Sequence, residues 1–127
     1  MNEPNERFKL FLEEMLEAMD RIAGYLGGMT FDDFVQHRMA VDAVVRNLEI
    51  IGEAAKHIPA LVRQKSPQIP WDKMYRLRNI VSHEYFSVDH ALIWDISVNN
   101  LPHNRADLEI LLETLRATSP DFPQPLP

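Results

Sequence analysis

The stretch that decides the fold is TFDDFVQHRMAVDAVVRNLEIIGEAAKHI, residues 30–58. Its apolar residues recur every seven positions, and a second apolar set is interleaved with the first, as on one face of a helix. They are Phe34, Val41, Leu48 and Ala55, with Val44, Ile51 and Ile58 interleaved. A stripe of this length predicts a helix of roughly 40 Å that runs to about His57 and packs along an antiparallel neighbour.

Four residues of this stretch carry local predictions. Thr30 and Asp33 have the spacing of a capping box, which would start the helix. Gly52 costs about 1 kcal/mol relative to alanine inside a helix, so we expect it to mark a close helix crossing. Asp33 and His37 lie four positions apart and could hold a metal, but no third ligand is evident and an exposed pair is the commoner case.

The flanking sequence predicts further helices. Upstream, an apolar stripe predicts a helix that Gly27-Gly28 ends or follows as a turn; the stripe comprises Phe8, Leu12, Met15, Met19 and Ile22. Downstream, Pro59 begins a short helix through Lys65, and Trp71 begins a long one. Trp71 and Trp94 have apolar neighbours and are expected to anchor the core.

The last third of the chain predicts two more helices. Asp89 caps a helix that carries Leu92, Ile93 and Ile96, residues 99–102 interrupt it, and a final helix carries Leu108, Leu111, Leu112 and Leu115. The fold class is therefore all-α, an up-down bundle of four to five helices. Residues 1–118 form one domain, and 119–127 are a proline-rich tail that cannot continue a helix.

Composition narrows the class of protein. Of the 127 residues 46% are apolar and 25% charged, as in globular proteins, and the absence of cysteine excludes disulfides and thiol chemistry. No apolar run is long enough for a membrane span and the N-terminus is acidic and polar, which predicts a cytoplasmic protein. The net charge of the chain is −6, but the charges of residues 35–88 sum to +3. That distribution is compatible with a nucleic-acid partner.

The segment WDKMYRLRNIVSHEY, residues 71–85, concentrates reactive side chains. On a helical wheel its apolar residues face the core, while the polar side gathers Arg78, Asn79, Ser82 and His83. Arginine suits a phosphate and histidine can transfer a proton near neutral pH, so the set suits metal-free RNA cleavage. Surface placement alone is the commoner reason for such a cluster. One histidine per chain is also too few for acid–base cleavage, unless two copies meet across a twofold axis.

RNIVSHEY, residues 78–85, resembles the R-x4-H-x-Y signature of the HEPN-domain toxins. NLEIIGEAAKHIP (47–59), PQIPWDKMYRLRNIVSHEYFSVD (67–89) and IWDISVNNLP (93–102) extend the likeness to the HepT-type branch, over roughly residues 8–116.

The resemblance implies a homodimer in which two motif helices line a shared cleft. It further implies a metal-independent endoribonuclease toxin, paired with an MNT-type nucleotidyltransferase antitoxin that silences it by transferring AMP to Tyr85. Arg78 and His83 would be catalytic, with Asn79 and Ser82 in support. No cofactor or metal is implied.

The alternative is a helical dimer that binds a nucleotidyltransferase or nucleotides without cutting RNA. Neither the RNA cleaved nor the stoichiometry with the antitoxin follows from the sequence. His57, His90 and His103 are expected to be isolated surface or capping residues, and Tyr75 to flank either the site or the dimer seam.

Overall fold

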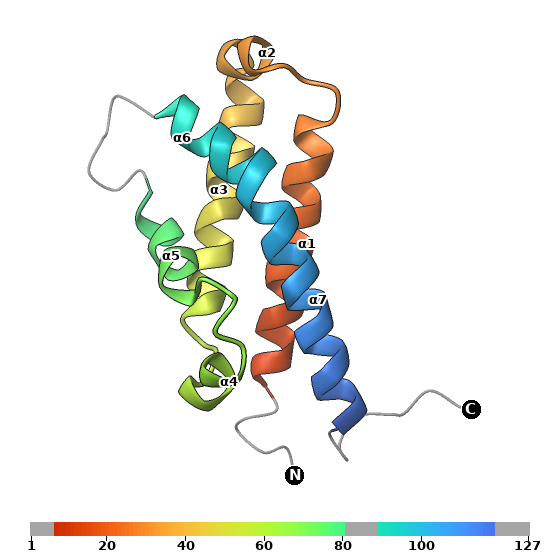
Figure 1. Cartoon of the computed structure of the whole chain (residues 1–127). Helices are drawn as coiled ribbons and strands as arrows, with labels where there is room; N and C mark the ends of the chain where they lie inside the picture. Colours follow the sequence, from red (N-terminus) through yellow and green to blue (C-terminus); the bar gives the residue numbers. More distant parts are fainter. Residues whose placement is uncertain (1–6, 81–88, 119–127) are drawn as a thin grey trace.

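The computed structural model describes residues 7–80 and 89–118, and within these ranges the chain forms helices joined by short turns, with no strand. Three helices are long: α1 (Phe8–Leu26), α3 (Arg38–Ala55) and α7 (Leu101–Thr118). α1 and α3 lie antiparallel, and α7 packs along α1 (Figure 1). The short helices are α2 (Phe31–Gln36), α4 (Ala60–Lys65), α5 (Trp71–Arg76) and α6 (His90–Asp95). The predicted all-α bundle is confirmed.

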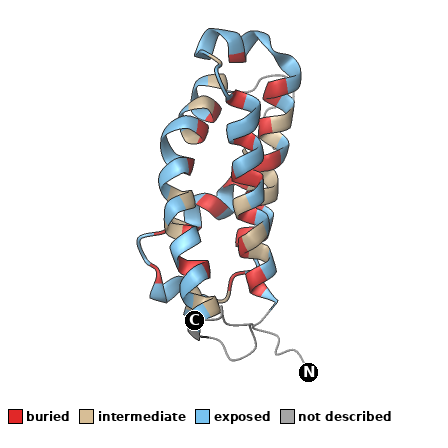
Figure 2. Ribbon diagram, turned by 90° about the vertical axis from the view of Figure 1, so that its right-hand side faces the viewer, coloured by how far each residue is buried: buried red, intermediate tan, exposed pale blue. Residues whose placement is uncertain are grey.

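The core lies between the long helices, as the apolar stripes predict. Every residue of the stripes in α1 and in residues 34–58 is buried, with an exposed fraction of 5% or less. Buried residues follow the inner faces of the helices while exposed residues cover the outer faces (Figure 2). Burial of these apolar faces is the main source of the stability of such a bundle.

The predicted single helix over residues 30–57 is wrong in one respect, because His37 divides it into α2 and α3. His37 has ψ of 85°, outside the helical region, and its Nδ1 accepts a hydrogen bond from the amide of Ala40 at 3.1 Å. The capping box at the start of α2 is confirmed: the Thr30 hydroxyl accepts from the Asp33 amide at 3.1 Å, and the Asp33 carboxylate accepts from the Thr30 amide at 3.0 Å.

Asp33 and His37 therefore both cap helices, which gives the two side chains a structural role. The two side chains satisfy backbone amides at the starts of α2 and α3. In the part of the chain that the structure describes, no three His, Asp or Glu side chains gather as a metal site would require.

The helix that begins at Trp71 is shorter than predicted. α5 ends at Arg76 and tightens into a single 3₁₀ turn, η2 (Leu77–Asn79). Trp71 anchors its start as expected, since the residue is 8% exposed and its indole N–H donates to the carbonyl of Ser66 at 3.0 Å.

The C-terminal part is a nearly continuous helical rod. Asp89 caps α6 as predicted, by accepting from the Leu92 amide at 3.0 Å. The interruption predicted at 99–102 is instead a π-helical segment, η3 (Ile96–Asn100), which leads directly into α7. A π turn inserts extra backbone without ending the helix.

The two ends of this rod contact different neighbours. α6 packs near α2 and α3, where the Trp94 ring lies 5.4 Å from the ring of Phe34. α7 is held to α1 by ion pairs from Arg105 to Asp20 and from Arg116 to Glu13, both at 2.6 Å. None of the helices in the described ranges is long and apolar enough to cross a membrane.

Candidate active site

Gly52 brings η2 into direct contact with α3. A Cβ atom at Gly52 would lie 2.4 Å from the backbone nitrogen of Arg78 and 3.0 Å from its Cα, far inside normal contact distances. The close crossing predicted at Gly52 is confirmed, and its partner is Arg78, the first residue of the R-x4-H-x-Y segment. The absence of a side chain at position 52 thus sets where Arg78 sits.

Contacts from two elements orient the Arg78 side chain. Its Nη1 donates to the hydroxyl of Tyr75 at 3.0 Å, and its guanidinium carbon lies 5.3 Å from the centre of the same ring. Its Nε lies 3.6 Å from a carboxylate oxygen of Glu53, one residue after Gly52 on α3. The Arg78 side chain is still 31% exposed, so a ligand can reach it. Tyr75 therefore flanks Arg78.

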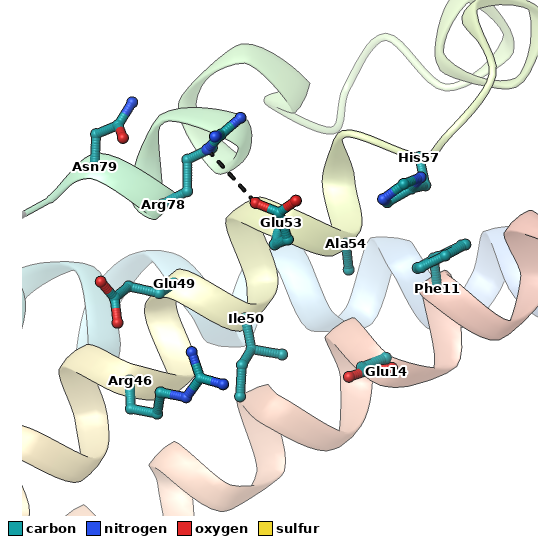
Figure 3. A pocket seen from close by; sticks show the side chains of 10 residues that line it. All are labelled: Phe11, Glu14, Arg46, Glu49, Ile50, Glu53, Ala54, His57, Arg78 and Asn79. Carbon is teal, nitrogen blue, oxygen red and sulfur yellow. Dashed lines mark ion pairs between the residues drawn. The ribbon is translucent and has the colours of Figure 1, made fainter.

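Arg78 and Asn79 stand at a pocket between α1 and α3 (Figure 3). The pocket has a volume of about 410 Å³ and takes its lining from α1, from the turn and helix of residues 46–57 and from η2. It is lined by Phe11, Glu14, Arg46, Glu49, Ile50, Glu53, Ala54, His57, Arg78 and Asn79.

The lining combines apolar and charged side chains. Ile50 and Ala54 are the aliphatic part, and Phe11 and His57 stack with ring centres 4.2 Å apart and planes 13° from parallel. The charged side chains are three carboxylates and two guanidinium groups: Glu14, Glu49, Glu53, Arg46 and Arg78. The pocket is thus locally acidic by one charge, although the middle of the chain is basic overall.

Three predicted site residues cannot be placed. Ser82, His83 and Tyr85 lie outside the described residues, so the structure gives no distance between Arg78 and His83. The helical wheel used for this segment assumed about 100° per residue, whereas a 3₁₀ turn advances by about 120°. Within the described residues, the predicted angles are therefore altered at Arg78 and Asn79, which lie in η2.

Sequence reasoning missed the contribution of α1 and α3 to this site. Arg46, Ile50, Glu53 and His57 follow one another at steps of four, three and four, which places them on one face of α3 and its C-terminal turn. This spacing can be read from the sequence. Only the contact between Gly52 and Arg78 shows that η2 packs beside this face of α3. His57 is exposed, as predicted, but it is not isolated, since it stacks on Phe11.

Comparison with known proteins places the chain in a family. The family model described as ribonuclease HepT-like matches residues 15–124. The chain belongs to the HepT-like ribonuclease family. The HepT-type resemblance of the motif and its flanking segments is thereby confirmed.

Curated relatives of this HepT-like chain agree with that assignment. It is 38% identical to the protein named "Putative RNase MJ0127" of Methanocaldococcus jannaschii over 112 residues, which cover 88% of this chain and 93% of the relative. It is 37% identical to "Probable ribonuclease HepT" of Thermococcus cleftensis over 103 residues, 81% of this chain and 94% of the relative. No solved structure matches the chain significantly.

Proposed function

We propose that this HepT-like protein is a metal-independent endoribonuclease toxin that acts as a homodimer in the cytoplasm. The observation that carries the proposal is the position of Arg78. The chain belongs to a ribonuclease family, and in it Arg78 is held by Gly52, Tyr75 and Glu53 in the lining of a pocket and remains partly exposed. A fixed guanidinium group is suited to bind a phosphate that gains charge in the transition state.

The proposed reaction is transfer of the RNA phosphate to the neighbouring 2′-hydroxyl. His83 takes the 2′-hydroxyl proton, the 2′-oxygen bonds to phosphorus, and the bond from phosphorus to the 5′-oxygen breaks. The leaving oxygen receives a proton from a second group, which the same residue of a second copy supplies in a homodimer. Arg78 stabilises the charge on the phosphorane, Asn79 orients the phosphate, and Ser82 supports this polar set.

Regulation is proposed to act on the same segment. An MNT-type nucleotidyltransferase antitoxin transfers AMP to the hydroxyl of Tyr85 and so silences the enzyme. An AMP group seven residues from Arg78 places a phosphate within reach of the site and adds negative charge where RNA must bind. Mass spectrometry of the chain co-expressed with such a nucleotidyltransferase tests this step, since Tyr85→Phe should prevent the gain of AMP.

RNA cleavage in the presence of EDTA tests the catalytic proposal. The full-length protein should cleave single-stranded RNA, and Arg78→Ala and His83→Ala should each abolish cleavage. Arg63→Ala, which removes an arginine on α4 away from the pocket, should cleave at the wild-type rate. Equal cleavage by all four proteins would disprove the catalytic assignment. If expression is harmless and His83→Ala changes only binding, the non-catalytic dimer module is correct instead.

A further inference from the structure

We propose that the pocket beside Arg78 binds one unpaired nucleobase of the substrate, and that it prefers guanine. This inference rests on the proposed function, because it assigns the base next to the phosphate held by Arg78. It concerns residues that the R-x4-H-x-Y segment does not include, namely those of α1 and of the face of α3 that carries Arg46, Glu49 and Ile50.

The first argument is the shape and polarity of the pocket. Its volume of about 410 Å³ falls in the range of small-molecule sites. Ile50 is half-buried and Ala54 is buried, so part of the lining is aliphatic. A nucleobase is flat, with apolar faces and polar edges, and it matches a lining that is partly aliphatic and partly charged.

The second argument is the stacked pair of rings. Phe11 and His57 come from different elements, α1 and the turn after α3, yet lie parallel with centres 4.2 Å apart. Both rings line the pocket and His57 is exposed, so a ligand can reach the stacked pair. Unpaired bases bind proteins chiefly by stacking on aromatic rings of this kind.

The third argument is charge. With Glu14, Glu49 and Glu53 in its lining, the pocket repels a phosphate, which is left to Arg78 at the mouth. Glu53 is already engaged with Arg78 and Lys56, each at 3.6 Å. Glu14 and Glu49 therefore remain as the carboxylates that can accept hydrogen bonds from a base.

The edges of guanine fit this arrangement best. Its N1–H and N2–H₂ groups are adjacent donors, which one carboxylate can accept together, and its O6 and N7 atoms accept a bidentate arginine. Glu49 and Arg46 are three residues apart on α3, so they lie on neighbouring turns of one face. Uracil has a single donor between two acceptors and suits a carboxylate less.

Binding can be tested apart from cleavage by NMR of the full-length protein with ¹³C-labelled isoleucine methyl groups. Guanosine 5′-monophosphate should shift the Ile50 methyl signal, uridine 5′-monophosphate should do so only at about tenfold higher concentration, and ribose 5-phosphate should not. Ile110, exposed on α7, is the internal reference. Phe11→Leu and Glu49→Gln should each weaken the effect about tenfold, while the control His103→Ala should leave it unchanged.

Cleavage of oligouridine containing one guanosine separates the two proposals. Preferential cutting beside that guanosine, reduced in Glu49→Gln, supports both. The base pocket is refuted if the protein cuts without base preference and the Ile50 signal is shifted by no nucleotide, or is shifted equally by ribose 5-phosphate. The proposed ribonuclease function would not be affected by that result. A guanosine-dependent Ile50 shift without any cleavage supports the pocket and refutes the proposed function.

Discussion

Replacing Gly52 by alanine tests whether the position of Arg78 matters for RNA cleavage, because the Arg78 side chain itself is unchanged. The substitution leaves every side chain of the site in the sequence and adds one methyl group on α3. That methyl would lie 2.4 Å from the backbone nitrogen of Arg78. The obstacle is backbone, so it cannot be relieved by rotating a side chain, and η2 must move away from α3.

The size of both effects follows from this distance. Carbon atoms in contact prefer separations of roughly 3.5 Å or more, so η2 must retreat by about 1 Å. A displacement of about 1 Å at a catalytic group is enough to lower activity about 100-fold. Overpacking costs about 1–3 kcal/mol, and the gain of about 1 kcal/mol in helix propensity offsets part of it, so the net loss of stability is about 0–2 kcal/mol.

RNA cleavage and urea unfolding of the same preparations measure the two effects. Gly24→Ala is the matched control, because Gly24 also lies inside a helix, yet a Cβ there meets nothing within 4 Å. It should gain about 0.5–1 kcal/mol in stability and keep full activity. If Gly52→Ala gains stability as Gly24→Ala does and cleaves RNA at the wild-type rate, the contact with α3 does not position Arg78.

Three further predictions concern the scaffold and are checked by unfolding measurements. Thr30→Ala should lose about 1 kcal/mol because the capping box at the start of α2 is broken, whereas Thr30→Ser should lose almost nothing. Trp71→Phe should lose about 1–2 kcal/mol, since the indole hydrogen bond to the Ser66 carbonyl disappears and the ring shrinks; full wild-type stability would contradict its anchoring role. Hydrogen bonds to Asp20, and secondly to Glu109, raise the pKa of Arg105 above its ordinary value. The stability that charged Arg105 contributes is therefore complete below its ordinary pKa and is lost only in strong alkali. Arg105→Met should therefore lose at most about 1 kcal/mol, equally at pH 6 and pH 9, and a loss that differs between these two pH values would contradict this reasoning.

The helices were predictable from the sequence where a single local signal, such as apolar spacing or a capping residue, determined the structure. Apolar spacing identified the buried faces of α1 and α3, and Thr30 and Asp89 marked helix starts by capping. The break at His37 had no such signal, because histidine is an ordinary helix residue and neither proline nor glycine is nearby. The break arises because the His37 imidazole accepts a hydrogen bond from the Ala40 amide and so caps α3, while the backbone of His37 leaves the helical conformation of α2.

The sequence predicted candidate site residues only on the element that carries the motif. Arg78 and Asn79 follow from the segment 71–85, and Gly52 signalled a close contact without naming its partner. The carboxylate of Glu53 and the ring of Phe11 belong to helices whose outer faces look like ordinary surface in the sequence. Contacts between residues so distant in the chain depend on packing, which spacing rules do not describe.

The π-helical segment Ile96–Asn100 fixes the number of residues between the two ends of the C-terminal rod. Upstream of it Trp94 contacts Phe34, and downstream of it Arg105 contacts Asp20 and Leu108 is buried. Deleting one residue would rotate one end relative to the other by about 100°, so both sets of contacts could not form together. This segment must therefore keep its length for the two ends of the rod to contact α1 and α2 at the same time.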